Sequence, residues 1–257
     1  MVRLALAATL LTLSVACKKK GEVTDAPEDT TAGGFIAISI DDEDEDFESS
    51  IGSELMAMVA ECGDLVKMEP AAMLGKLEEP DIRCLESTLT QAEKQTHKDK
   101  ISRVMMNDAW AKGDLHRWES IVARHLDMVD RSDPDLVYKF SLHLSKQGAD
   151  RAIETMRWAD VALENRAHWS GETHVDRVNA LYRIRTFASH QLWEAYEMKY
   201  VAGPTDELLS MKDEQRNTVK TMAREWLEYA RSSGRDPTLA MQICVSAAGN
   251  TDYCEEL

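Results

Sequence analysis

Apolar residues beyond Ser50 recur every three or four positions, the spacing that places them on one face of an α-helix. The first stripe predicts a single helix and consists of Leu55, Met58, Val59, Cys62, Leu65 and Val66. Further stripes begin after Pro80-Asp81, Lys98, Gly113-Asp114 and Ser132-Asp133-Pro134, most of which are typical of tight turns and helix starts. Short turns of this kind join antiparallel neighbours. The pattern predicts an all-α domain over residues 51–257.

Beyond Gly148 the pattern continues with four more helices. A return helix follows the glycine, with its stripe from Ala152 to Leu163. Two longer helices come next, with stripes over residues 181–195 and 219–230. A short last helix is predicted after Asp236-Pro237, because Asp and Pro favour a helix start.

A repeat of helix pairs emerges from the glycine positions. Gly113 and Gly148 lie 35 residues apart, each between two predicted helices, and tetratricopeptide repeats have a period of about 34 residues. The small-large-small pattern of that family's second helix occurs at Ala152, Met156 and Ala159 and again at Ala223, Leu227 and Ala230. The chain from about Asp99 to Asp236 therefore resembles a divergent tetratricopeptide-type array. It lacks the family's Trp-Leu-Gly-Tyr positions and its last two helices are too long, so an irregular helical bundle is the alternative.

Composition and charge support a helical domain and exclude one class of partner. Of the 257 residues 44% are hydrophobic, which is enough for an ordinary core, and only 6% are aromatic. The formal net charge is −16, and such a field repels the phosphates of nucleic acids. We expect no nucleic-acid partner.

Residues 1–16 have the layout of a secretory signal peptide, with Arg3 before an apolar run and small residues at its end. The run is too short to span a bilayer, which takes about 20 helical residues. The stretch Leu13-Ser14-Val15-Ala16-Cys17 resembles the lipobox of bacterial lipoproteins, although Ser14 stands where that motif usually has Leu. The resemblance implies that Cys17 becomes the lipidated first residue and anchors the protein at a membrane, facing the periplasm.

Residues 17–50 predict an acidic, flexible tether behind the anchor. They hold three Lys and eleven Asp or Glu with no helical period. The run Asp41–Asp46 contains no Gly that would turn the chain around a calcium ion, so a solvated charge run is favoured. Lys18 follows Cys17, where inner-membrane lipoproteins of enteric bacteria often have Asp, and this resemblance favours the outer membrane.

Four cysteines remain once Cys17 is set aside, an even number in an exported chain, and the periplasm is oxidising. Of the three possible connectivities we predict Cys62 with Cys84 and Cys244 with Cys254. An antiparallel return of helices brings the first pair together, and the turn-forming residues 249–252 fold the second pair together. The alternative is four reduced thiols that pack as small core residues.

No sequence motif indicates an active site, a metal centre or a cofactor. The seven His are scattered, and no Gly-x-Ser-x-Gly, phosphate-binding glycine loop or Cys-x-x-Cys occurs. His168 and His174 flank one turn, but two imidazoles alone predict a solvated turn better than a metal site. We expect no catalytic residue, no metal and no cofactor.

Aromatic residues are the candidates for partner contacts. The six Trp fall mostly at helical positions, where core packing is the default. Trp158 and Tyr182 lie at the edges of their stripes, so we predict that they are exposed and contact a partner.

Together these features predict a membrane-anchored periplasmic adaptor, whose helical-repeat surface binds other proteins of an envelope assembly. The alternative is a cell-envelope enzyme that uses a carboxylate pair in a helical groove. An open surface with exposed aromatics favours the adaptor, and a deep pocket with perturbed carboxylates favours the enzyme.

Overall fold

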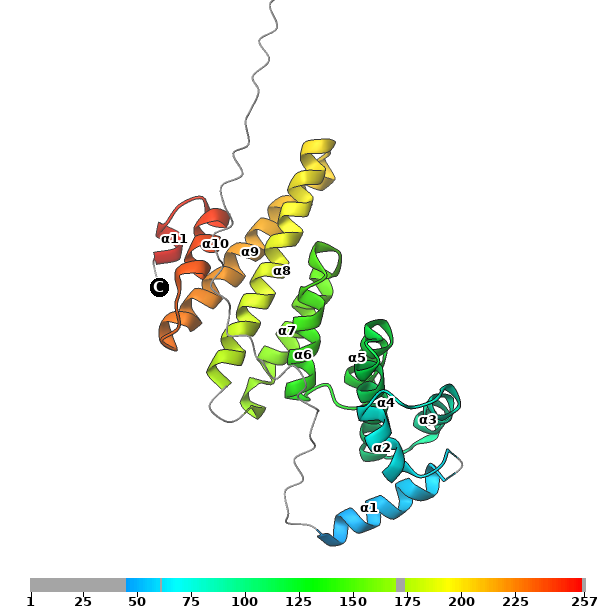
Figure 1. Ribbon diagram of the computed structural model, residues 1–257. Coiled ribbons are helices and arrows are strands. Elements are labelled where there is room, and N and C mark those ends of the chain that lie inside the picture. Colours follow the sequence, from blue (N-terminus) through cyan, green and yellow to red (C-terminus); the bar gives the residue numbers. More distant parts are fainter. Residues whose placement is uncertain (1–44, 61, 170–173, 256–257) are drawn as a thin grey trace, which may run out of the picture. The chain divides into compact units, whose positions relative to one another are not determined.

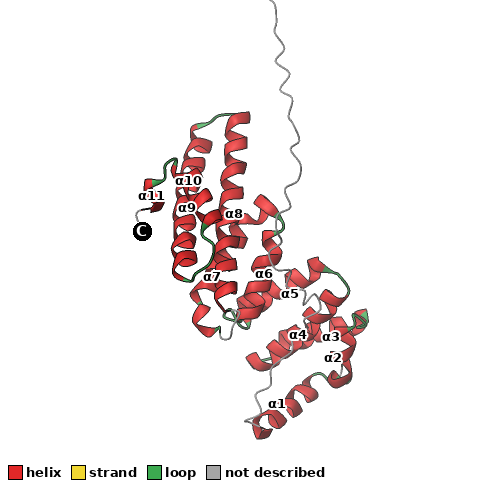
Figure 2. Ribbon diagram, turned by 60° about the vertical axis from the view of Figure 1, so that its left-hand side comes forward, coloured by secondary structure: helices red, strands yellow, loops and turns green. Residues whose placement is uncertain are grey.

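The computed structural model describes residues 45–60, 62–169 and 174–255, which form eleven α-helices, two short 3₁₀ helices and no strand (Figure 2). All of them belong to one compact unit, Ile38–Leu257. The all-α prediction is confirmed. The α-helices are α1 Glu45–Met58, α2 Leu65–Met73, α3 Glu79–Gln91, α4 Gln95–Ala111, α5 Leu115–Met128, α6 Pro134–Ser145, α7 Ala152–Glu164, α8 His174–Ala202, α9 Asp206–Ser232, α10 Thr238–Ala248 and α11 Asp252–Glu255. The 3₁₀ helices are η1 Gly148–Arg151 and η2 Arg166–His168.

The first predicted helix is wrong as a single element, because the chain turns between α1 and α2. Gly63 has φ +117°, a conformation that an L-residue rarely adopts and that a helix excludes. Leu55 and Leu65 are nevertheless both buried, so the apolar spacing continues across a break that it cannot reveal. The helix α1 begins at Glu45, inside the segment predicted as a tether. Cys17, the signal peptide and residues 17–44 of the tether lie outside the described residues.

Side-chain caps begin several helices where turn residues predict them. Asp114 and Asp133 are the N-caps of α5 and α6, and each carboxylate accepts a hydrogen bond from a backbone N–H of the first turn. The start of α3 differs from the prediction. Pro80 and Asp81 lie inside its first turn, and Asp81 accepts a hydrogen bond from the backbone N–H of the true N-cap, Glu78, at 2.9 Å.

The helices pack mainly on their neighbours in chain order (Figure 1). The helices α2 and α3 contact α4, α4 contacts α5, α7 contacts both α6 and α8, and α9 contacts both α8 and α10. Gly113 and Gly148, with φ +70° and +75°, reverse the chain between helices as predicted. Consecutive packing follows from these short reversals, because each helix buries its stripe against the next one.

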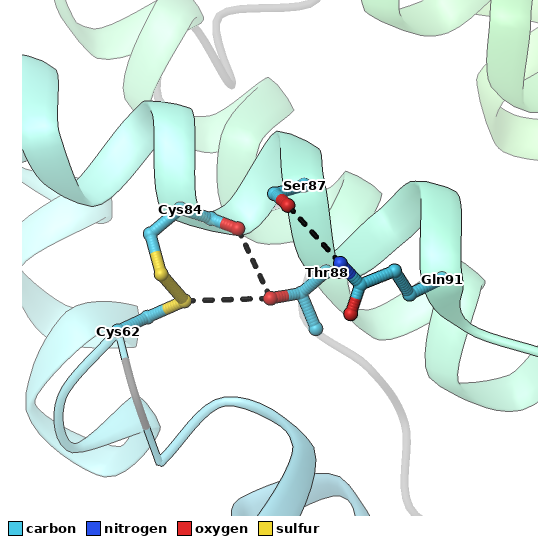
Figure 3. The surroundings of a disulfide bond; sticks show 5 residues. All are labelled: Cys62, Cys84, Ser87, Thr88 and Gln91. Atoms are coloured by element: carbon cyan, nitrogen blue, oxygen red, sulfur yellow. Dashed lines mark hydrogen bonds between the residues drawn. A yellow bond between two sulfur atoms is a disulfide. The ribbon is translucent and has the colours of Figure 1, made fainter.

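Two disulfides join the pairs of cysteines named from the sequence. Cys62, in the turn after α1, is bonded to Cys84 on α3 (Figure 3). The Thr88 hydroxyl donates a hydrogen bond to the Cys84 carbonyl at 3.0 Å and lies 3.4 Å from the Cys62 sulfur. Cys244 on α10 is bonded to Cys254 on α11, and both of these residues are buried.

Candidate protein-binding surface

Four aromatic rings form a row across four consecutive helices. Trp110 on α4 lies 5.1 Å from Trp118 on α5, measured between ring centroids. Trp118 lies 6.1 Å from Phe140 on α6, and Phe140 lies 5.7 Å from Trp158 on α7, both edge to face. Aromatic pairs at these separations add about 0.5–1.5 kcal/mol each beyond the area they bury. The row therefore ties α4, α5, α6 and α7 together.

The two ends of the row differ in exposure. Trp158 is only 1% exposed, so the prediction that it is an exposed partner contact is wrong. The reason is that α7 is covered by both α6 and α8, which buries the edge of its stripe as well as its centre. The guanidinium of Arg157 also covers the Trp158 ring, 4.7 Å from its centroid. Trp110, at the other end of the row, is 55% exposed.

Tyr182 on α8 is half-buried and already has partners within the chain. Its ring stacks on that of Tyr229 at 5.0 Å, and the Arg185 guanidinium lies 5.2 Å from its centroid. Arg166 donates a hydrogen bond to its hydroxyl at 3.4 Å. Burial, with Tyr182 nearby, raises the pKa of Tyr229. Tyr182 is therefore part of a cluster of contacts within the chain and is only partly exposed.

The turns that adjoin the end of α4, where Trp110 lies, also carry exposed apolar side chains. Met73 is the last residue of α2, Leu74 follows it in the turn, and Leu115 is the first residue of α5. All three are exposed, as Trp110 is. We call these four residues the Trp110 patch. Large exposed apolar side chains on neighbouring turns are candidates for a site of association.

A buried carboxylate holds the backbone beneath the Trp110 patch in place. Asp108 is fully buried, and one of its oxygens accepts a hydrogen bond from the Leu77 backbone N–H at 3.1 Å. Lys112 donates to the other oxygen at 2.7 Å and to the Leu77 carbonyl at 2.6 Å. Gly75, with φ +64°, lets α2 approach α4 so closely that a Cβ there would lie 3.1 Å from the Lys112 backbone nitrogen. The turns that carry the patch are therefore fixed to one another.

The position of Trp110 at the end of its helix is a sequence signal for exposure. Ile101, Met105 and Ala109 are fully buried and repeat every four residues along α4. Trp110 lies one turn beyond the buried Met106, in the last turn before Gly113. A large aromatic residue in the last turn of a helix is a better candidate for exposure than one in the middle of a helix.

A polar pocket of about 410 Å³ lies where α9 faces α7 and α8. Arg185 forms its buried part and donates hydrogen bonds to Asp160, at 2.8 Å, and to Glu225. Burial opposes the charge of Arg185, but the two carboxylates outweigh it and raise the pKa of the guanidinium. Both carboxylates thus neutralise a cation of the chain itself, an arrangement that joins three helices.

One Ser-His-Asp arrangement lies in the interior. The Ser102 hydroxyl is 2.7 Å from His125 Nδ1, and Asp99 Oδ1 is 3.6 Å from His125 Nε2. Ser102 and His125 are almost completely buried, and the Ser102 hydroxyl also lies within hydrogen-bond distance of the carbonyls of Lys98 and Asp99. A substrate has no access to this hydroxyl, so the arrangement links α4 to α5. Burial lowers the pKa of His125, which favours the neutral imidazole.

Within residues 45–60, 62–169 and 174–255, no three His, Cys, Asp or Glu side chains come close enough to hold a metal ion. Across the same residues, every helix is too short or too polar to cross a bilayer. Comparisons of the chain with models of protein families, with characterised proteins and with solved structures found no match. The surface geometry therefore carries the functional argument.

Proposed function

We propose that this protein is a membrane-anchored periplasmic scaffold that binds another protein of the cell envelope through the Trp110 patch. The observation that carries the proposal is the exposed indole of Trp110 on a rigid support. Tryptophan is enriched among the residues that dominate binding energy at protein interfaces. Fixed turns beneath the patch lower the entropy cost of binding, because little needs to become ordered.

The remaining parts of the proposal rest on the sequence and on the order of packing. Helix pairs that reverse at Gly113 and Gly148 and pack in chain order are compatible with a divergent tetratricopeptide-like array, which offers an extended binding surface. Two disulfides suit an oxidising compartment such as the periplasm. A lipidated Cys17 followed by an acidic tether holds this surface near the membrane, with the outer membrane favoured.

The binding surface is tested by purification of the tagged full chain from cross-linked membranes of its native host. Trp110→Ser is expected to lose a partner that the wild type retains, because the indole is the anchor. Met128→Ser is the matched control, since Met128 is 61% exposed at the far end of α5, outside the Trp110 patch. Retention of every partner by Trp110→Ser at wild-type amounts contradicts the proposed surface.

The anchor is tested separately by fractionation of cells that carry Cys17→Ser. We expect this variant to leave the membrane fraction, because its terminus cannot be acylated. If it stays in the membrane at the wild-type level, lipidation of Cys17 is not what holds the protein there.

A further inference from the structure

We call the outer half of the α8–α9 hairpin, residues 190–218, the α8–α9 arm. Its tip projects beyond the helices that flank the hairpin (Figure 1), and its base contacts α10, where Arg216 donates a hydrogen bond to the Ala247 carbonyl at 2.7 Å. The structure describes all of these residues, and none of their side chains is fully buried. Each helix contributes 13 residues, so the arm is about 20 Å long at 1.5 Å per residue. The inner halves of the same helices contain many buried residues, so the burial of a side chain in this hairpin depends on its distance from the tip.

The α8–α9 arm is rich in apolar and aromatic side chains, although none of them is fully buried. Met198 and Val201 are 68% and 78% exposed, and at a spacing of three residues they share one face of α8. Tyr200, close to both, is half-buried under the Lys212 ammonium, 4.7 Å from its centroid. Two helices can cover only one face of each other, so the other faces of the arm stay open.

Packing at the inner half of the hairpin indicates which kind of element could pack on the exposed face of the arm. There α7 lies against α8 and α10 lies against α9, so each helix of the hairpin has a further helix as its neighbour. Beyond the contact of Arg216 with α10, the same two helices continue to the tip of the arm, where Met198 and Val201 are exposed. A helix from another chain can extend this packing by one more element.

Charge decides between a second copy and a different partner. Residues 190–218 contain six Asp or Glu and three Lys or Arg, and the whole chain has a net charge of −16. Two copies would bring like charges together, whereas a basic partner is attracted. We propose that the α8–α9 arm is a docking site for an amphipathic helix of a different protein, one whose apolar face is flanked by lysine or arginine. This site goes beyond the Trp110 patch and does not depend on it.

The test uses a photo-cross-linking amino acid in the full chain, expressed in its native host, at Met198 or Val201. Met128 and Ile153 are matched control positions, because they are 61% and 66% exposed but lie on α5 and α7. We expect the two arm positions to capture the same protein and the controls to miss it. The captured segment, sequenced by mass spectrometry, is expected to be an apolar helix with basic flanks.

A peptide of the captured segment then measures the chemistry of the site. Against the full chain its affinity is expected to fall about tenfold or more in Met198→Ser/Val201→Ser, because two apolar contacts are lost. Met128→Ser/Ile153→Ser is expected to bind as the wild type does. Affinity is also expected to weaken between about 0.1 M and about 1 M salt, which screens the acidic arm.

Several outcomes overturn the proposal. Capture of a second copy of this chain from Met198 or Val201 shows the arm to be a self-association surface, and capture of lipid shows a membrane contact. An acidic captured segment, equal capture from the control positions, or no adduct also contradicts it. Trp110→Ser leaves the arm unchanged, so capture from Met198 and Val201 in this variant tests the arm independently of the Trp110 patch. A failure of the arm proposal can therefore be told apart from a failure of the proposed function.

Discussion

Replacement of Trp158 by alanine is expected to destabilise the protein strongly. The side chain is 1% exposed and contacts the Phe140 ring edge to face, with centroids 5.7 Å apart. Truncation of a buried Trp to Ala typically costs about 3–5 kcal/mol, and the lost ring contact belongs to this figure. The Trp158 indole N–H is buried without a hydrogen-bond partner, and its removal returns a small part of the loss, about 1 kcal/mol. We therefore expect a net loss of about 3 kcal/mol.

Two further variants separate the role of burial from the role of the ring. Trp158→Phe keeps an aromatic ring and removes the unpartnered N–H, so its loss is expected to be about 1 kcal/mol or less. Trp110→Ala removes a ring that is 55% exposed, so the free energy of unfolding is expected to fall by about 1 kcal/mol at most. The two alanine variants should therefore differ by about 2 kcal/mol.

The assay is urea unfolding of the purified protein, followed by far-ultraviolet circular dichroism. Equal slopes against urea for all variants show that a midpoint shift reports stability alone. Equal losses for Trp110→Ala and Trp158→Ala would refute the view that one end of the aromatic row is core and the other is surface. A negligible loss for Trp158→Ala would do the same.

Three more outcomes follow from particular contacts. Removal of the Cys244–Cys254 disulfide by a double change to alanine is expected to cost about 3 kcal/mol, because the bond closes a loop with a sequence separation of 10; an unchanged urea midpoint contradicts this. Arg185→Met leaves its two half-exposed carboxylate partners without a cation and is expected to cost about 1–2 kcal/mol in the same assay, whereas a stabilised variant shows that burial of the guanidinium outweighs its pairs. Because burial lowers the pKa of His125 below 6.5, the folded state binds fewer protons there than the unfolded state, so stability is complete above about pH 6.5 and declines below it. His125→Asn should show a shallower decline between about pH 7 and about pH 5, and an unchanged pH profile excludes His125 as the cause.

Helix order could be predicted from the sequence because stripes and turn residues act locally. Asp133 and Pro134 begin α6 where the pattern places its start, since a side-chain cap and a fixed φ operate within one turn. The break at Gly63 could not be predicted from spacing, because the apolar residues keep their helical spacing on both sides of it. Glycine in such a run was the available signal, and its conformation depends on the turn that α2 needs to reach α4.

Exposure was harder to predict than helix position. Whether the edge of a stripe is covered depends on how many neighbours a helix has, and Trp158 is buried because α7 has one on each side. The partners of Arg185 lie 25 and 40 residues away along the chain, and no local pattern relates them. Sequence periodicity gives the face that each helix buries, and tertiary contacts decide the rest.

Packing in chain order has a consequence for how binding and stability are coupled. When each helix contacts mainly its neighbours, stability is close to a sum of local terms, and the elements at either end have a neighbour on one side only. The two disulfides lie at these ends, one fastening the turn after α1 to α3 and the other fastening α11 to α10. A disulfide lowers the conformational entropy of the unfolded chain, and this stabilisation compensates for the packing that the end helices lack on their outer side. A change in the Trp110 patch should therefore leave the α8–α9 arm folded, so loss of binding at one surface can be attributed to that surface.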